Sequence, residues 1–201
     1  MVRTGKEYRF AVVGSGPAGV CIAAMLLPSV PNCRVDVFDR HPHPYGLIRT
    51  GVCPDHPAMK RITDDYAGIF EQYHDRCAFF GNVWVGEIDK NSHDYGLAKA
   101  HLSKEGSSSV SVQQLRDRYS AVVLAHGAAD DKLLGLKHEL TAHGILPARR
   151  VVNWYNGSLD DDLDTERDFN IRNSKDLLII GNGNIACDIV RALSKDPREF
   201  E

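Results

Sequence analysis

The sequence predicts an α/β fold built on parallel β-strands, because a strand leads twice through a glycine-rich turn into a helix. The first unit is YRFAVVGSGPAGVCIAAMLL at residues 8–27, and the second is DLLIIGNGNIACDIVRALS at residues 176–194. A second apolar, β-branched stretch, RVDVF at 34–38, follows the first unit closely and completes a βαβ unit. The 201 residues are enough for one large domain or one and a half ordinary ones.

Composition and charge exclude several classes of protein. The chain is 43% hydrophobic and 25% charged, as in soluble globular proteins, and its net charge of −3 favours neither a nucleic-acid binder nor a membrane-surface protein. No apolar run approaches the roughly 18 residues of a membrane span. The N-terminus, MVRTGKEYRF, is too short and polar for a secretory signal.

The cysteines predict neither a zinc ribbon nor a redox dithiol. None of them forms a C-x-x-C pair, and their scatter fits reduced thiols. Cys21 is expected in the core, inside the first helix. The pattern His41-x-His43 lacks a matching cysteine or carboxylate set, so no metal site is predicted. The five cysteines are Cys21, Cys33, Cys53, Cys77 and Cys187.

The first half of the chain is predicted to alternate strands and helices. Residues 8–13 form a buried parallel strand, residues 17–27 a helix that Pro28 ends, and residues 34–38 the next strand. The proline- and glycine-rich stretch 41–57 is expected to be a shaped loop. One helix with an apolar face should then run from Pro57 to about Asp75.

The second half contains less regular structure. Residues 78–85 predict a pair of short strands or one bulged strand, with a break at Gly81-Asn82, and residues 89–111 predict a mobile surface excursion. Ser111-x-x-Gln114 is a candidate capping box at the start of a short helix.

Two more strands and a helix are expected near the end of the chain. Buried strands are predicted at 119–125 and 176–180, and a helix at 185–194. The acidic stretch 158–168 is expected to be a solvated loop.

The first glycine turn has the features of a dinucleotide-binding site. A strand that turns sharply into a helix presents backbone N–H groups and the positive end of the helix dipole to an anion. Gly14 permits the turn, Gly16 allows a pyrophosphate to approach, and Gly19 allows the helix to pack on the strand. Asp39 ends the second strand, 20 positions after Gly19, where an acid would bind a ribose hydroxyl.

The second turn is G-x-G-x-x-A, with Gly181, Asn182, Gly183 and Asn184 at its start. It also follows an apolar run and opens a helix. Two dinucleotide sites on one chain suggest electron transfer between a bound flavin dinucleotide and a nicotinamide cofactor.

Several segments, in order along most of the chain, resemble the adrenodoxin reductase family of NADPH-dependent ferredoxin reductases, which have a glutathione-reductase-like flavin fold. The most specific is the PxGLxRxGVxPDHP pattern, which glutamate-synthase-type NADPH subunits share; they form the alternative family. The segments are VVGSGPAG at 12–19, PYGLIRTGVCPDHPAMK at 44–60, CAFFGNVWVG at 77–86, AVVLAHGA at 121–128, NWYNG at 153–157 and GNGNIACDIVR at 181–191.

The resemblance implies an FAD-binding Rossmann-like domain, residues 1–118, followed by the start of a second Rossmann-like domain for NADP, residues 119–201. Asp39 would bind the adenosine ribose, although the family favours Glu there. Asp55 and His56 match a stretch near the flavin, where the expected roles are a proton shuttle at His56 or structural hydrogen bonding by the pair. By resemblance, FAD would be held by Gly14, Gly16, Ala18, Gly19, Asp39, Leu47 and Val85. The NADP pyrophosphate would be held by Gly181, Asn182, Gly183 and Asn184.

The implied activity is hydride transfer from NADPH to the flavin, followed by single-electron transfer to an iron–sulfur protein of ferredoxin or adrenodoxin type. No catalytic residue is predicted, because the flavin supplies the chemistry. The resemblance places eukaryotic relatives in the mitochondrial matrix and bacterial relatives in the cytoplasm.

The chain departs from the family in length and at Cys53, where the family usually has alanine. Relatives continue well past residue 201, so the chain is expected to be C-terminally truncated. A catalytically silent FAD-fold fragment, or an interaction module, is therefore an alternative function. A flavin disulfide reductase is a weaker alternative, since the chain has no paired-cysteine motif.

Overall fold

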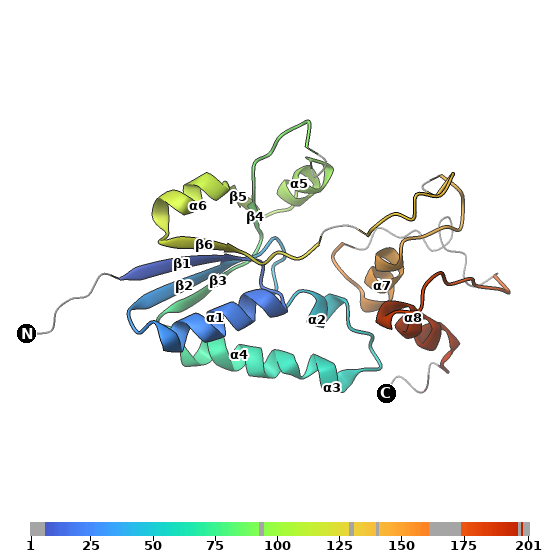
Figure 1. Cartoon of the computed structure of the whole chain (residues 1–201), viewed down its shortest axis with the longest axis horizontal. Helices are drawn as coiled ribbons and strands as arrows, with labels where there is room; N and C mark the ends of the chain where they lie inside the picture. The colour runs from blue at the N-terminus through green and yellow to red at the C-terminus, as the bar shows by residue number, and fades with distance from the viewer. Residues whose placement is uncertain are drawn as a thin grey trace, which may run out of the picture. The chain divides into compact units, whose positions relative to one another are not determined.

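The computed structural model describes residues 7–92, 95–128, 131–139, 141–160, 174–196 and 198, in two compact units (Figure 1). The first unit comprises Met1–Ile48 and Arg61–Gly127, and the second comprises Arg49–Lys60 and Ala128–Glu201. The predicted boundary at 118/119 between an FAD domain and an NADP domain stays a prediction. The strand after residue 119 lies in the first unit, because it pairs with the first strand of the chain.

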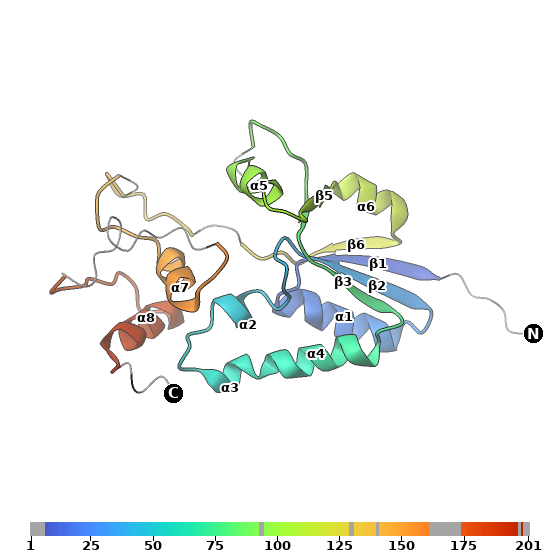
Figure 2. The same ribbon diagram turned by 180° about the vertical axis from the view of Figure 1, so that it is seen from behind.

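The described part of the first unit is built on a parallel sheet with the order β3-β2-β1-β6. In register, Val12 of β1 lies between Val37 of β2 and Val123 of β6. Helices α1 and α4 cover one face and α6 covers the other (Figures 1 and 2). The strands are β1 (Tyr8–Val13), β2 (Cys33–Phe38), β3 (Cys77–Phe80) and β6 (Ala121–Leu124). The helices are α1 (Pro17–Ser29), α4 (Ile62–Gln72) and α6 (Val112–Arg118). This arrangement confirms the predicted α/β fold.

Alternate side chains of the strands build a core on each face of the sheet. Burial of these apolar side chains is the main force that holds the sheet between its helices. In the core between the sheet and helices α1 and α4, the buried residues are Val12, Ala23, Leu27, Cys33, Val35, Val37 and Cys77. On the α6 face they are Ala11, Val13, Phe38 and Leu115.

Three predicted element boundaries are wrong. The first helix continues one residue past Pro28, to Ser29, although proline lacks the N–H group that an α-helix uses. The predicted helix 57–75 is two helices, α3 (Pro57–Lys60) and α4, which divide at Arg61. The predicted loop 41–57 contains a short helix, α2 (Leu47–Thr50).

The stretch 89–111 contains regular structure that the sequence analysis missed. Helix α5 (Tyr95–Leu102) buries Ala98 and His101, and β5 (Ser108–Val110) pairs in parallel with β4 (Val83–Val85). The sequence analysis missed α5 and β5 because most residues of 89–111 are polar. The capping box is confirmed, since the Gln114 N–H donates to Ser111 Oγ at 3.0 Å and the Ser111 N–H donates to Gln114 Oε1 at 2.8 Å.

The described part of the second unit contains helices α7 (Ala148–Asn156) and α8 (Asn184–Ser194), which pack through Val151, Val152 and Ile189. The predicted strand 176–180 is not formed. It has no ladder partner among the described residues, and Leu178 is 84% exposed. Residues 161–168 of the predicted acidic loop lie outside the described residues. No described helix is both long and apolar enough to cross a membrane.

Candidate dinucleotide-binding sites

The first glycine turn lies at the carboxyl ends of parallel strands. The chain leaves β1 through Gly14–Gly19, Asp39 directly follows β2, and Ala125 directly follows β6. Strands β2 and β3 extend the sheet on one side of β1, and β6 on the other. The reversal of strand order beside β1 is a topological switch point, where open α/β sheets bind their ligands.

Two glycines of this turn are required by the packing of the chain itself. Gly14 has a φ of +100°, and a Cβ there would lie 2.4 Å from the carbonyl oxygen of Ala125. At Gly19, a Cβ would lie 1.9 Å from the carbonyl oxygen of Gly14. A side chain at either position would therefore force the strand, the turn and α1 apart.

Gly16 differs from its two neighbours. Its backbone is extended, with φ −69° and ψ −174°, and a Cβ would meet no described atom within 4 Å. Packing within the described chain therefore does not require glycine there, and the absent side chain leaves open space over the turn. In the described structure, α1 begins at this space with neither a side-chain cap nor an acidic residue in its first turn. Such a helix start attracts a phosphate group.

The side chain of Asp39 accepts hydrogen bonds from the first glycine turn. Its Oδ2 accepts hydrogen bonds from the Ser15 N–H at 2.8 Å and from Ser15 Oγ at 2.6 Å, while Oδ1 accepts one from the His41 N–H at 2.9 Å. These donors occupy most of a carboxylate's roughly four lone-pair sites. The ribose contact predicted for Asp39 stays a prediction, and the structure adds a second role in bracing the turn. Ser15, which is fully buried, was not predicted.

The loop before α2 contacts the same turn. The Tyr45 N–H donates to the carbonyl oxygen of Ser15 at 2.9 Å, and a Cβ on Gly46 would lie 3.0 Å from Gly16 Cα. Tyr45 has a φ of 88°, which is strained for a bulky side chain and is stabilised only by its surroundings. In the sequence, the turn residues Pro44 and Gly46 on either side of Tyr45 could have predicted a close approach of this loop.

The remaining predicted FAD residues lie near this end of the unit. Leu47 directly follows Gly46 and is 56% exposed. Val85 ends β4 and packs in the core cluster of Ala11 and Val13. Ala18 is exposed in the first turn of α1. Their contacts with a flavin stay predictions.

The second glycine turn is open in the described structure. Gly181 has a φ of +126°, Gly183 is the N-cap of α8, and a Cβ on either would meet no described atom within 4 Å. Asn182 and Asn184 are exposed. The first turn of α8 has neither a side-chain cap nor an acidic residue among the described residues. A cavity of about 520 Å³ beside the turn is lined by Ile179, Gly181, Asn182, Ala186, Cys187, Val190, Arg191 and Ser194.

Asp55 and His56 lie in the second unit, against α8. Asp55 is 3% exposed and forms a two-pronged ion pair with Arg191, in which Nη2 donates to Oδ1 at 3.0 Å and Nε donates to Oδ2. Hydrogen bonds from Arg191 hold the pKa of Asp55 well below its ordinary value, against the opposing effect of burial. Arg191 was not singled out by the sequence analysis, although it ends the GNGNIACDIVR segment.

The cysteines do not form a reactive site in the described structure. Cys53 is fully buried, and burial together with a hydrogen bond to Asp55 raises the pKa of its thiol. Burial likewise raises the pKa of Cys77 to about 11. Cys21 was predicted in the core but is exposed, with its Sγ 3.6 Å from Tyr66 Oη. Among the described residues, no group of His, Cys, Asp and Glu could hold a metal ion.

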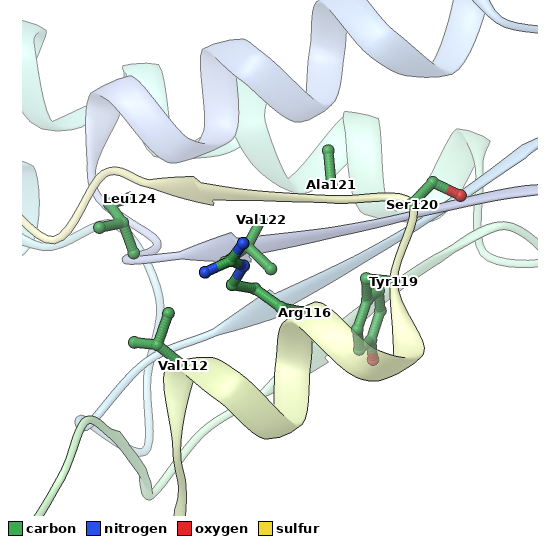
Figure 3. Close-up of a pocket in the computed structure, with 7 residues that line it drawn as sticks. All are labelled: Val112, Arg116, Tyr119, Ser120, Ala121, Val122 and Leu124. Carbon is green, nitrogen blue, oxygen red and sulfur yellow. The ribbon is translucent and has the colours of Figure 1, made fainter.

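A further cavity, of about 370 Å³, lies in the first unit between α6 and β6 (Figure 3). Arg116 reaches from α6 toward the strand across it. No residue predicted to bind a cofactor lines it. The lining residues are Val112, Arg116, Tyr119, Ser120, Ala121, Val122 and Leu124.

Comparisons with known proteins identify the family of the chain. The family profile "Pyridine nucleotide-disulphide oxidoreductase" matches residues 8–196. The chain is 38% identical over 202 residues to the mitochondrial NADPH:adrenodoxin oxidoreductase of Arabidopsis thaliana and 36% identical over 196 residues to that of Homo sapiens. Each match covers 98% of this chain but only 35% and 34%, respectively, of the relative's length.

Solved structures give the same result. FprA, a Mycobacterium tuberculosis oxidoreductase, superimposes with a TM-score of 0.78 and 33% identity over 97% of this chain and 38% of that chain. The structure of FprA in complex with NADPH gives the same values. The chain therefore belongs to the pyridine nucleotide-disulphide oxidoreductase family, and within it resembles the NADPH:adrenodoxin oxidoreductases.

Proposed function

We propose that this chain forms the FAD site and part of the NADPH site of a flavoprotein that passes electrons from NADPH to an iron–sulfur protein of ferredoxin or adrenodoxin type. The names of its relatives support the electron donor and the class of acceptor. The observation that carries the proposal is the open space at Gly16, at the start of an uncapped helix. A pyrophosphate fits there, because it needs backbone N–H groups and the absence of a Cβ.

Different residues of the first unit would contact different parts of FAD. Gly14 and Gly19 fix the turn, while Gly16 and Ala18 border the space for the pyrophosphate. Asp39 has little acceptor capacity left for a ribose hydroxyl, so we expect one direct hydrogen bond or a bridging water. Leu47 and Val85 would provide apolar contact with the cofactor.

NADPH would bind at the second turn, with its pyrophosphate over Gly181–Asn184 and the start of α8. The cavity of about 520 Å³ beside the second turn would accommodate part of NADPH. When bound, the flavin accepts a hydride from NADPH and releases its electrons singly to the iron–sulfur acceptor. The chain's own groups bind and orient, and none is required to form a covalent bond. We propose the mitochondrial matrix as the location if the source is eukaryotic, and the cytoplasm otherwise.

One observation favours a second candidate, a flavin-binding domain that is catalytically silent by itself. The apolar side chains of Leu177, Leu178 and Ile180 are exposed, in a sequence that reads as a strand but has no ladder partner among the described residues. The chain spans about a third of the length of the curated relatives it matches, 35% for the first. Flavin binding without turnover would fit this candidate for residues 1–201 alone.

The experiment uses the purified chain incubated with FAD and then desalted. We expect a retained flavin band in the visible spectrum. We also expect weak or absent reduction of a ferredoxin when NADPH is added. A chain that retains no flavin would contradict the FAD site, and brisk ferredoxin reduction would contradict the expectation that residues 1–201 lack turnover.

A further inference from the structure

Residues Arg49–Lys60, here called the strap, have an unusual place in the chain. They belong to the second unit, whereas Ile48 before them and Arg61 after them belong to the first. The strap is held in the second unit by side chains of α7 and α8. Asn156 Nδ2 of α7 donates to the carbonyl oxygen of Thr50 at 3.1 Å, and Lys60 Nζ donates to Asn156 Oδ1 at 3.3 Å. Arg191 of α8 makes a further contact with the strap.

Arg191 lies at the centre of a polar cluster. Its guanidinium binds both carboxylate oxygens of Asp55, donates from Nη2 to Asp188 Oδ1 at 2.7 Å, and places the same Nη2 2.6 Å from His56 Nε2. Lys195 Nζ is more distant, 3.8 Å from Asp55 Oδ2. Because Asp55 is almost completely buried, it needs a countercharge, and Arg191 is the closer of the two.

The cluster also determines which nitrogen of His56 carries a proton. A guanidinium has donors only, so His56 Nε2 must accept from Arg191, and the ring N–H then lies on Nδ1. Asp188 Oδ1 lies 3.6 Å from the same Nε2. Without Arg191, the acceptor nearest to Nε2 would be this carboxylate, and a proton on Nε2 would be favoured instead.

We infer that Arg191 is a positioning residue that fastens the strap to α8 and sets the tautomer and orientation of His56. The contacts that support this role involve no nucleotide, so the inference holds or fails independently of the proposed function. If that function is correct, Arg191 fixes which ring nitrogen His56 presents beside the helix of the second glycine turn.

The first test is ¹⁵N NMR of histidine-labelled chain at pH 8, with Arg191→Met compared with the wild type. His56→Gln identifies the His56 signal. We expect the Nδ1–H form of His56 in the wild type and a shift toward the Nε2–H form in Arg191→Met. Arg198→Met is the matched control, because Arg198 pairs with Asp196 at the surface and should leave the signal in place. An unchanged His56 signal in Arg191→Met would overturn the inference.

The second test measures opening of the strap by the rate at which a maleimide labels Cys53, read by mass spectrometry. Cys53 is fully buried, whereas Cys187 is exposed and gives the unprotected rate. We expect Arg191→Met to speed Cys53 labelling by about tenfold or more, because the buried Asp55 loses its principal countercharge. The buried Cys33 and Cys77 of the first unit should keep their wild-type rates. Unchanged Cys53 labelling would contradict the role of Arg191 in fastening the strap.

A conservative variant covers the case in which Arg191→Met unfolds the second unit, so that Cys53 reacts as fast as Cys187. Arg191→Lys keeps the charge but cannot bind both Asp55 and His56 with a planar fork. We expect this variant to keep Cys53 protected while the His56 signal still shifts. A wild-type His56 signal in Arg191→Lys would show that the fork has no positioning role.

Discussion

At the scale of single residues, the three glycines of the first turn have different reasons to be glycine. Gly14 and Gly19 are required by the backbone atoms that surround them, so any Cβ there would clash. Gly16 has a backbone that any residue can adopt and faces open space among the described atoms. The structure thus separates glycines that the fold requires from one that only a ligand would require.

Gly14→Ala should destabilise the first unit by about 2–4 kcal/mol, because it combines an unfavourable φ with a clash against backbone. Urea unfolding followed by circular dichroism measures this change. Gly68→Ala in α4 is the control, since its Cβ would meet no described atom, and we expect it to be neutral or stabilising by about 0.5–1 kcal/mol. Equal stability of Gly14→Ala and the wild type would contradict the packing argument.

The sequence predicted these glycines and Asp39, but it did not predict what Asp39 binds. The G-x-G-x-x-G spacing is a local pattern, so it can be read from the chain directly. The bond from Ser15 to Asp39 depends on how the ends of β1 and β2 meet, whereas the bond from His41 is local, only two positions away. Arg191 was missed because its partners in the strap, His56 and Asp55, lie 135 and 136 positions away.

At the scale of elements, the sequence predicted the structures that depend on neighbouring residues but not those that depend on distant strands. The capping box at Ser111 and the first strand, 8–13, were predicted from neighbouring residues and are confirmed. The pair β4 and β5 was missed because its partners are 25 positions apart, as Val83 and Ser108 are. Conversely, residues 176–180 have the composition of a strand, but a strand also needs a neighbour, and none of the described residues provides one.

Ser111→Ala should lower the free energy of unfolding of the first unit by about 0.5–2 kcal/mol, since it removes the side-chain cap of α6. Thermal unfolding of the chain measures the effect. Ser109→Ala, at an exposed position of β5, is the matched control and should change stability much less. If both substitutions had the same effect, the cap would not stabilise α6.

At the scale of the whole molecule, the predicted FAD and NADP domains stay predictions, and long-range pairing decides how the chain divides into two compact units. Strand β6 pairs in parallel with β1, as Val12 does with Val123, although the two residues are far apart in the sequence. The strap belongs to the second unit through Asp55 and Arg191, which are distant in sequence. Long-range pairing of this kind determines where a unit ends, and no pattern of neighbouring residues predicts it.

The buried Asp55 should make the stability of the second unit depend on pH. Its pKa is lower in the folded state than its ordinary value of 3.8, because Arg191 binds the charged form. Folding therefore favours loss of the proton, so the stabilisation is complete above about pH 4 and is lost as the pH falls toward the folded value. Urea unfolding between pH 3 and 7, followed by Trp154 fluorescence in Trp84→Phe chain, measures this loss. Asp55→Asn in the same background should show a smaller pH dependence, and an identical one would contradict the assignment to Asp55.

The central claim is that the space at Gly16 is kept open for the pyrophosphate of FAD. The most direct measurement is the Kd for FAD of the wild type and of Gly16→Ala, by fluorescence titration, with thermal unfolding of both chains without ligand. We predict binding by the wild type, a Kd at least about tenfold weaker in Gly16→Ala, which is about 1.4 kcal/mol, and equal unfolding temperatures. Gly183→Ala, in the second turn, should bind FAD as the wild type does. Wild-type affinity in Gly16→Ala, or a wild type that does not bind FAD, would contradict the claim.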